Sequence, residues 1–96
     1  TLFDITSSSS SQCWAMTSYL PVPGPVPASP ANRDYQPGFT TAMMAKDMRL
    51  AEDAASSVGQ KTSLASNALK LYQKYMESGG GSRDFSGIFT MISEDE

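Results

Sequence analysis

The stretch GFTTAMMAKDMRLAEDAA, residues 38–55, predicts a long amphipathic helix. At about 100° per residue, its apolar side chains fall on two adjoining sides of the helix. The first side carries Phe39, Met43, Leu50 and Ala54, and the second carries Met44, Met48, Ala51, Ala55 and Val58. We expect the helix to run from about Thr40 to Val58, with Thr40 or Thr41 as its cap and Gly59 in the left-handed position past its end.

Two charged residues of this helix lie outside its polar strip. That strip consists of Ala45, Arg49, Glu52 and Ser56. Lys46 and Asp47 fall instead among the apolar residues of the first side. They could form an internal ion pair, or the lysine stem could pack while its ammonium reaches water. Alternatively, the helix lines a cleft and presents Lys46 to a carboxylate, a hydroxyl or a cofactor ribose, since a buried lysine without a partner is costly.

The rest of the chain also reads as helix, with no convincing strand. Residues 2–5 resemble the last turn of a helix, and a serine is expected to cap a short helix over 12–19 with Trp14 as its core anchor. A helix over 63–78 shows a regular apolar stripe from Leu64 to Met76, with Thr62 or Ser63 as its cap. A last helix over 83–92 has Ser82 as its cap and Asp84 in its first turn. The fold class is therefore all-α, a small bundle of three to four helices with antiparallel neighbours.

All six prolines of the chain lie between Leu20 and Gly38. Alternating prolines exclude helix and favour extended backbone, so this part is either a stiff crossing segment or a linker. A polyproline ligand for an adaptor domain has a similar composition. However, such ligands normally lie in polar tails and not between two apolar helical segments.

Composition narrows the classes of function. The 96 residues suffice for one small domain, and the net charge of −3 with scattered basic residues argues against a nucleic-acid partner. No apolar run is long enough to span a membrane. The chain has no histidine, which excludes the usual zinc sites and any Ser-His or Cys-His catalytic pair within it. The single Cys13 is expected to be a small buried hydrophobe, and Glu52 and Asp53 to be solvated partners of Arg49.

A series of short motifs carries a family resemblance across nearly the whole chain. In chain order they are CW at 13–14, LPVPG at 20–24, RDYQPGF at 33–39, MAKDMRLAEDAA at 44–55, ALKLY at 68–72 and RDFSGIF at 83–89. Their order and spacing resemble the C-terminal part of the β-hydroxyacid dehydrogenases, in particular the 3-hydroxyisobutyrate branch. One departure is that Ser11 and Gln12 stand where the family often has Gly-Arg.

The resemblance implies a two-domain parent enzyme. An N-terminal Rossmann domain would bind NAD, and an interdomain helix would carry the catalytic lysine, so that no catalytic residue lies in this chain. Residues 1–96 would be the helical C-terminal domain, inactive alone. In the family, the lysine matched by Lys46 reaches toward the nicotinamide end of the cofactor. Phe39 matches a phenylalanine that lines the cleft, and Asp47 matches the acid that helps to order the site.

The implied reaction is the oxidation of 3-hydroxyisobutyrate to methylmalonate semialdehyde in valine degradation, by an enzyme that forms homo-oligomers. Eukaryotic members act in mitochondria, and a bacterial one would be cytoplasmic. Two alternatives remain: another member of the family, such as a glyoxylate or semialdehyde reductase, and a standalone helical interaction module. The uncapped LFDI start at residues 2–5 favours a piece of a longer protein over the standalone module.

Overall fold

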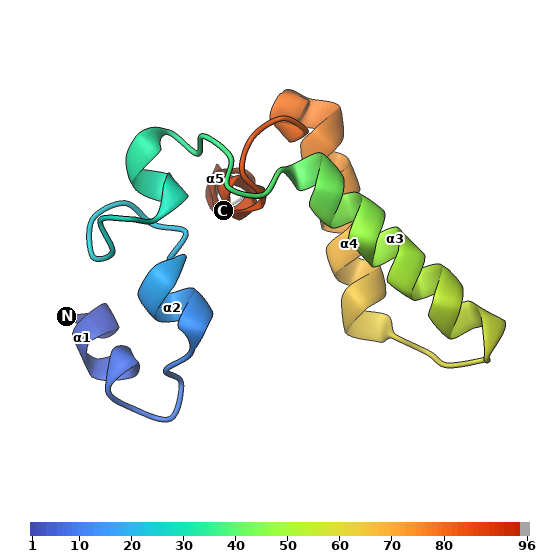
Figure 1. The fold of residues 1–96 in the computed structure, drawn as a ribbon, viewed down its shortest axis with the longest axis horizontal. Coiled ribbons are helices and arrows are strands. Elements are labelled where there is room, and N and C mark those ends of the chain that lie inside the picture. Colours follow the sequence, from blue (N-terminus) through green and yellow to red (C-terminus); the bar gives the residue numbers. More distant parts are fainter. Residues whose placement is uncertain (95–96) are drawn as a thin grey trace.

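The structure, a computed structural model, describes residues 1–94, which are mostly helical and form no β-sheet, and this confirms the predicted fold class. Its elements are α1 (Leu2–Ser7), α2 (Trp14–Ser18), the 3-10 helix η1 (Pro30–Arg33), α3 (Thr41–Ser57), α4 (Ser63–Tyr75), the π-helical turn η2 (Met76–Gly80), the 3-10 turn η3 (Phe85–Gly87) and α5 (Ile88–Glu94). Helices α3 and α4 form an antiparallel hairpin on one side of the molecule, α1 and α2 lie on the other, and α5 lies between them (Figure 1).

The long helix follows its sequence signals closely. The side chain of Thr40 caps α3 by accepting a hydrogen bond from the Met43 N–H. Gly59 follows the helix with a φ of +72°, the left-handed conformation that glycine adopts without strain. The predicted bounds and both terminal signals of this helix are therefore confirmed.

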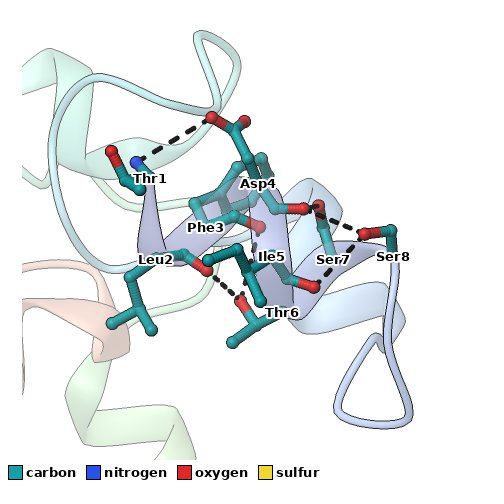
Figure 2. A network of polar contacts seen from close by, with 8 residues as sticks. All are labelled: Thr1, Leu2, Phe3, Asp4, Ile5, Thr6, Ser7 and Ser8. Atoms are coloured by element: carbon teal, nitrogen blue, oxygen red, sulfur yellow. Dashed lines mark hydrogen bonds and ion pairs between the residues drawn. The ribbon is translucent and has the colours of Figure 1, made fainter.

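Hydroxyl groups end the first helix, as Figure 2 shows. Thr6 donates to the Leu2 carbonyl at 2.9 Å, and Ser8 donates to the carbonyl of Asp4 at 3.0 Å. The bond from Ser8 satisfies a carbonyl that a continuing helix would have used, which favours the end of the helix at this point. The predicted helical turn over 2–5 is confirmed, and α1 extends it to Ser7.

Helix α2 differs from the prediction in three ways. It begins at Trp14 with Cys13 at its cap position, and no serine side chain caps it. Trp14 is 71% exposed and stacks only on Tyr19, at 6.0 Å between ring centroids, so its expected role as a core anchor is wrong. Cys13 is exposed and not buried. None of the five residues of α2 is buried, so this short helix offers no core in which either side chain could be covered.

The proline-rich part is a folded crossing segment and not a linker. Ser29 and Pro30 are almost fully buried, and the Ser29 hydroxyl donates to the Leu20 carbonyl. Tyr35 closes the segment by donating from its phenol to the Pro21 carbonyl at 2.7 Å. The stiff backbone thus returns on itself and joins α2 to the start of α3.

The C-terminal part departs most from the prediction. Ser82 caps nothing, and Asp84 itself is the cap of η3, with its carboxylate accepting from the Ser86 N–H. The helix expected over 83–92 is therefore a 3-10 turn followed by α5 from Ile88. Asp84 is drawn out of the helix because its carboxylate is shared with the N–H groups of Gly38 and Phe39.

Helix α4 is shorter than expected, because the π-helical turn takes over at Met76 and Gly79 adopts a φ of +102°. Leu64, expected in its packed stripe, is 88% exposed, since the first turn of α4 extends beyond the body of the molecule. Thr62 does not cap the helix through its side chain, and its hydroxyl donates instead to Glu52. Glu52 thus joins the hairpin and is not the expected solvated partner of Arg49. None of the helices in residues 1–94 is long and apolar enough to cross a bilayer.

Candidate functional site

The two charged residues singled out in the sequence lie on the open side of α3. Lys46 and Asp47 are both exposed, and no hydrogen bond or ion pair joins Lys46 to another residue of the described range 1–94. Of the alternatives left open by the sequence, the internal ion pair is therefore wrong, and Lys46 is not buried. The apolar residues around Lys46 are also open: Met43 is 52% and Leu50 is 57% exposed.

The opposite side of α3 packs against α4. Ala45, expected in the polar strip, is buried, and Met48 and Ala55 are half-buried. Glu52, from the same strip, accepts hydrogen bonds from the hydroxyls of Thr62 and Ser66, the latter at 2.6 Å. Because Ala45 is small and Glu52 is hydrogen-bonded, α3 and α4 can approach each other on this side. The apolar side of α3 that carries Met43 and Leu50 therefore remains at the surface of the described chain.

Phe39 lies just before Thr40, the cap of α3, and seven residues before Lys46. Because Phe39 precedes the helix, the period of α3 does not fix the direction of its side chain. The Phe39 side chain is half-buried, and its ring meets the Phe85 ring edge to face, with 5.9 Å between centroids. Of the three predicted site residues, Lys46 and Asp47 are exposed on α3, and Phe39 lies half-buried just before that helix.

A buried carboxylate, which the sequence analysis missed, holds this surface in place. Asp84 is fully buried, and its Oδ1 accepts from the N–H groups of Gly38 at 2.9 Å and Phe39 at 3.0 Å and from the Tyr19 hydroxyl. Its Oδ2 accepts from the N–H and hydroxyl of Ser86. A signal for this role was present in the Asp-x-Ser pattern of residues 84–86, which is typical of a carboxylate that caps a turn.

These contacts set the ionisation of the network. Burial by itself would raise the pKa of Asp84, but the hydrogen bonds from Ser86, Tyr19 and the backbone outweigh it and hold the pKa below its ordinary value. Burial, followed by the hydrogen bond to Asp84, raises the pKa of Tyr19 to about 12. At neutral pH the network therefore contains one anionic carboxylate that accepts from a neutral phenol.

A second feature is an apolar groove between α2 and α5, with a volume of about 450 Å³. Its walls come from α2, from the start of the proline-rich segment, and from η3, α5 and Tyr72 of α4. The lining residues include Trp14, which is 71% exposed, and Ile92, which is 41% exposed. Such a concentration of exposed apolar side chains is typical of a surface that another part of a protein covers. We call it the α2–α5 groove.

The chemistry open to these residues is limited. Among residues 1–94 there is no group of three or more histidine, cysteine or acidic side chains that could hold a metal ion. Lys46 offers an ammonium with three hydrogen-bond donors, beside exposed apolar side chains. This combination suits binding to an oxygen-rich, partly apolar ligand, and does not by itself supply a nucleophile or a general base.

Comparisons with known proteins agree on one family. Residues 1–92 match the family described as "NAD-binding of NADP-dependent 3-hydroxyisobutyrate dehydrogenase". A Mycobacterium tuberculosis relative named "Probable 3-hydroxyisobutyrate dehydrogenase" is 45% identical over 87 residues, which are 91% of this chain and 29% of that protein. The Drosophila melanogaster protein named "3-hydroxyisobutyrate dehydrogenase, mitochondrial" is 40% identical over 93 residues, 97% of this chain and 29% of that protein.

A solved structure shows the same fold. The Mycobacterium tuberculosis 3-hydroxyisobutyrate dehydrogenase, determined with L-serine, superposes with a TM-score of 0.88 at 43% sequence identity. The match covers 95% of this chain and 31% of that one. This chain therefore spans less than a third of the length of the relatives that it matches.

Proposed function

The chain belongs to the 3-hydroxyisobutyrate dehydrogenase family, and from that premise we propose that residues 1–96 are the helical C-terminal domain of an NAD-dependent dehydrogenase. The intact enzyme would oxidise 3-hydroxyisobutyrate to methylmalonate semialdehyde, the step that belongs to valine degradation. A Rossmann domain outside this chain would bind most of the cofactor, and the general base would lie on a helix outside this chain as well. Within this chain, the surface around Lys46 would form one wall of the active-site cleft.

The observation that carries this proposal is the state of Lys46. An exposed ammonium without a protein partner in the described range stands among exposed apolar side chains, on the side of α3 turned away from α4. A wall of a cleft shared with a second domain has this character, because it must accept both the apolar and the polar parts of a ligand. The family description, which names NAD binding, supports a cofactor contact within this segment.

Each of the three site residues would have a distinct task. NAD supplies the hydride acceptor when it is bound. Lys46 would donate hydrogen bonds from its ammonium to an oxygen atom at the nicotinamide end of the cofactor and hold that end in place. Phe39 would line the cleft and exclude water, and Asp47 would limit the directions that the ammonium can take.

The α2–α5 groove supports the same proposal from another part of the molecule. Its apolar walls and the 71% exposed Trp14 would be costly in a chain that functions alone. We propose that the remainder of the dehydrogenase, including contacts between subunits of a homo-oligomer, covers this groove. Relatives from eukaryotes carry the word mitochondrial in their names, and a eukaryotic source would place this enzyme there too.

The proposal is tested by Lys46→Ala in the intact dehydrogenase that contains this chain, with the exposed lysine of α4 as the control, Lys70→Ala. Loss of a charged hydrogen bond to the cofactor should raise the KM for NAD by about tenfold, equivalent to about 1.4 kcal/mol, while Tm stays unchanged. The control should leave both values unchanged. A fall in Tm with unchanged kinetics would instead assign Lys46 to the fold and remove the main support for the cleft.

A further inference from the structure

The backbone of Phe39 is held by the two residues Asp84 and Phe85 at both of its polar groups. Its N–H donates to Asp84 Oδ1 at 3.0 Å, and its carbonyl accepts from the Phe85 N–H at 2.8 Å. The rings of Phe39 and Phe85 meet edge to face, with centroids 5.9 Å apart. Phe39 precedes the helix, where the backbone has no helical hydrogen bonds to fix it, so these contacts determine where its side chain lies.

The same short segment anchors the first turn of α3. Thr41, which is fully buried, donates from its N–H and from its hydroxyl to the Arg83 carbonyl, at 2.9 and 3.1 Å. The Ala42 N–H donates to the Gly81 carbonyl at 3.0 Å. Residues 81–85 thus satisfy the N–H groups that the start of any helix leaves without partners. The orientation of α3, and with it the direction of Lys46, is fixed at this end.

A buried charge is an expensive way to join two segments. An apolar pair of similar volume is often as stable or more stable, whereas a carboxylate fixes several donors in one geometry. Asp84 joins Gly38, Phe39 and Tyr19 at one oxygen atom, across as many as 65 residues of sequence. Gly38 allows this approach, since a Cβ atom at that position would lie 2.8 Å from the Tyr19 hydroxyl oxygen.

From this geometry we propose that Asp84 and Phe85 are positioning residues of the dehydrogenase, which fix the Phe39 ring and the start of α3 against the cofactor cleft. The inference rests on the proposed function of this surface. It assigns no contact between either residue and substrate or cofactor. Their effect on the reaction passes through Phe39 and through the orientation of Lys46.

The test uses Asp84→Asn and Phe85→Leu in the intact dehydrogenase, assayed well below their Tm. The asparagine variant weakens the hold on the Phe39 N–H, and the leucine variant removes the ring contact and keeps the backbone bond. We expect kcat/KM for NAD to fall about tenfold in the first and less in the second, since a displacement of about 1 Å in a positioned group has effects of this size or larger. Ser86→Ala is the matched control, because it removes a donor to Oδ2 of Asp84 and leaves Oδ1 untouched; it should lower Tm and leave kcat/KM unchanged.

Three outcomes would overturn the inference. Unchanged kinetics in both test variants would do so. So would a loss of kcat/KM in Ser86→Ala that, relative to its fall in Tm, is as large as the loss in Asp84→Asn. If Asp84→Asn does not fold, unchanged kinetics in Phe85→Leu alone decide against it. Phe39→Ala separates this result from the proposed function: if it impairs NAD kinetics while the test variants do not, only the positioning role fails, and if it has no effect, the role of this surface as a cleft wall fails.

Discussion

At the scale of single residues, the most consequential side chain is Asp84. It is fully buried, remains ionised because five hydrogen bonds reach its two oxygen atoms, and connects segments far apart in the sequence. Removal of one partner from such a buried charge is more damaging than the net value of the pair suggests, because the other groups keep their desolvation cost. Its ionisation should therefore be visible in the stability of the whole chain.

We predict that stability falls on acidification and that Asp84 causes a large part of the fall. The folded pKa of Asp84 lies below its ordinary value of 3.8, so the folded state binds this proton less readily than the unfolded state. The stabilisation is complete above the unfolded pKa and is lost as pH falls through the folded pKa. Urea midpoints measured from about pH 6 to about pH 2 should show this loss.

In Asp84→Asn, the dependence on pH should be weaker and the midpoint at neutral pH lower. Glu52→Gln serves as the comparison, because hydrogen bonds from Ser66 and Thr62 lower the pKa of Glu52 as well. An acid profile of Asp84→Asn parallel to that of the unchanged protein would contradict the assignment.

A second prediction at this scale concerns a close contact of glycine. A Cβ atom at Gly87 would lie 2.5 Å from the Tyr75 hydroxyl oxygen, and Tyr75 is only 5% exposed, so its ring cannot move aside easily. Gly87→Ala should destabilise the fold by about 1–3 kcal/mol, the usual cost of overpacking a core. Urea unfolding measures this loss.

The control for that change is Gly81→Ala. Gly81 has a right-handed helical backbone, and a Cβ there would meet its nearest atom, in Met76, at 3.8 Å. Alanine fits this backbone and reduces the freedom of the unfolded chain, so the variant should be neutral or slightly stabilised. Equal losses in the two variants would show that the crowding around Tyr75 is not the cause.

At the scale of elements, the α3–α4 hairpin is closed by a polar contact and not only by apolar packing. The Glu52 carboxylate of α3 accepts from Thr62, at the start of α4, and from Ser66, one turn further along. This arrangement fixes the angle at which the hairpin opens, while the other side of α3 remains free. Helix α3, which carries Lys46, is thus held on the side that faces α4.

We predict that Glu52→Gln lowers the urea midpoint of unfolding, because an amide is a weaker acceptor than a carboxylate and places an N–H₂ group toward one of the two hydroxyls. Asp53→Asn is the matched control. It removes the same charge from the adjacent, exposed position, which joins no hydrogen bond or ion pair within residues 1–94. A midpoint that falls equally in both variants would point to net charge and not to closure of the hairpin.

At the scale of the whole molecule, the chain leaves much apolar surface open on two sides. Leu2, Trp14 and Leu64 are all more than 70% exposed, and the α2–α5 groove lies between the two halves of the fold. Large open apolar areas of this kind mark surfaces that pack against other protein. The described residues therefore resemble a domain whose apolar surfaces pack against other protein. This agrees with the fact that the chain spans less than a third of the length of its relatives.

We predict that acrylamide quenches the fluorescence of Trp14, the only tryptophan of the chain, nearly as efficiently as free tryptophan when the chain is monomeric. In the intact dehydrogenase, the same residue should be protected if the remainder of the enzyme covers the α2–α5 groove, as we propose. Size-exclusion chromatography establishes the monomeric state, and Trp14→Phe identifies the signal in the intact enzyme. Strong protection in the monomeric chain would contradict the open rim of the groove.

The helices themselves were predictable, because their signals are local. Thr40 at the cap of α3, Gly59 past its end and the glycines after α4 act within one turn of where they stand, and the structure confirms the bounds that they set for α3. The spacing of seven residues between Phe39 and Lys46 predicted one side of the helix for both, but Phe39 lies before α3 begins, where helical spacing does not apply. The proline-rich segment was also predictable, but the sequence did not decide whether it is a folded crossing segment or a linker.

The packing of those helices was not predictable in the same way. Periodicity fixes the angles between side chains of one helix, but the rotation of that helix about its own axis depends on its neighbours. Ala45 and Glu52 were therefore assigned to the polar strip, although they pack against α4, and Trp14 was assigned to a core that does not cover it. The apolar side of α3 that carries Met43 and Leu50 is the exposed one.

The sequence by itself thus determined an all-helical chain and its main helical segments, and it identified Lys46 and Asp47 as charged residues outside the expected polar strip of α3. Only the tertiary structure decided which sides of the helices are covered. It also showed that Asp84 does not belong to the first turn of a helix and that its carboxylate joins Tyr19 to the start of α3. The reason is physical. Caps, turns and periodicity act over a few residues, whereas the burial of a charge depends on donors that the fold brings together from 65 residues away.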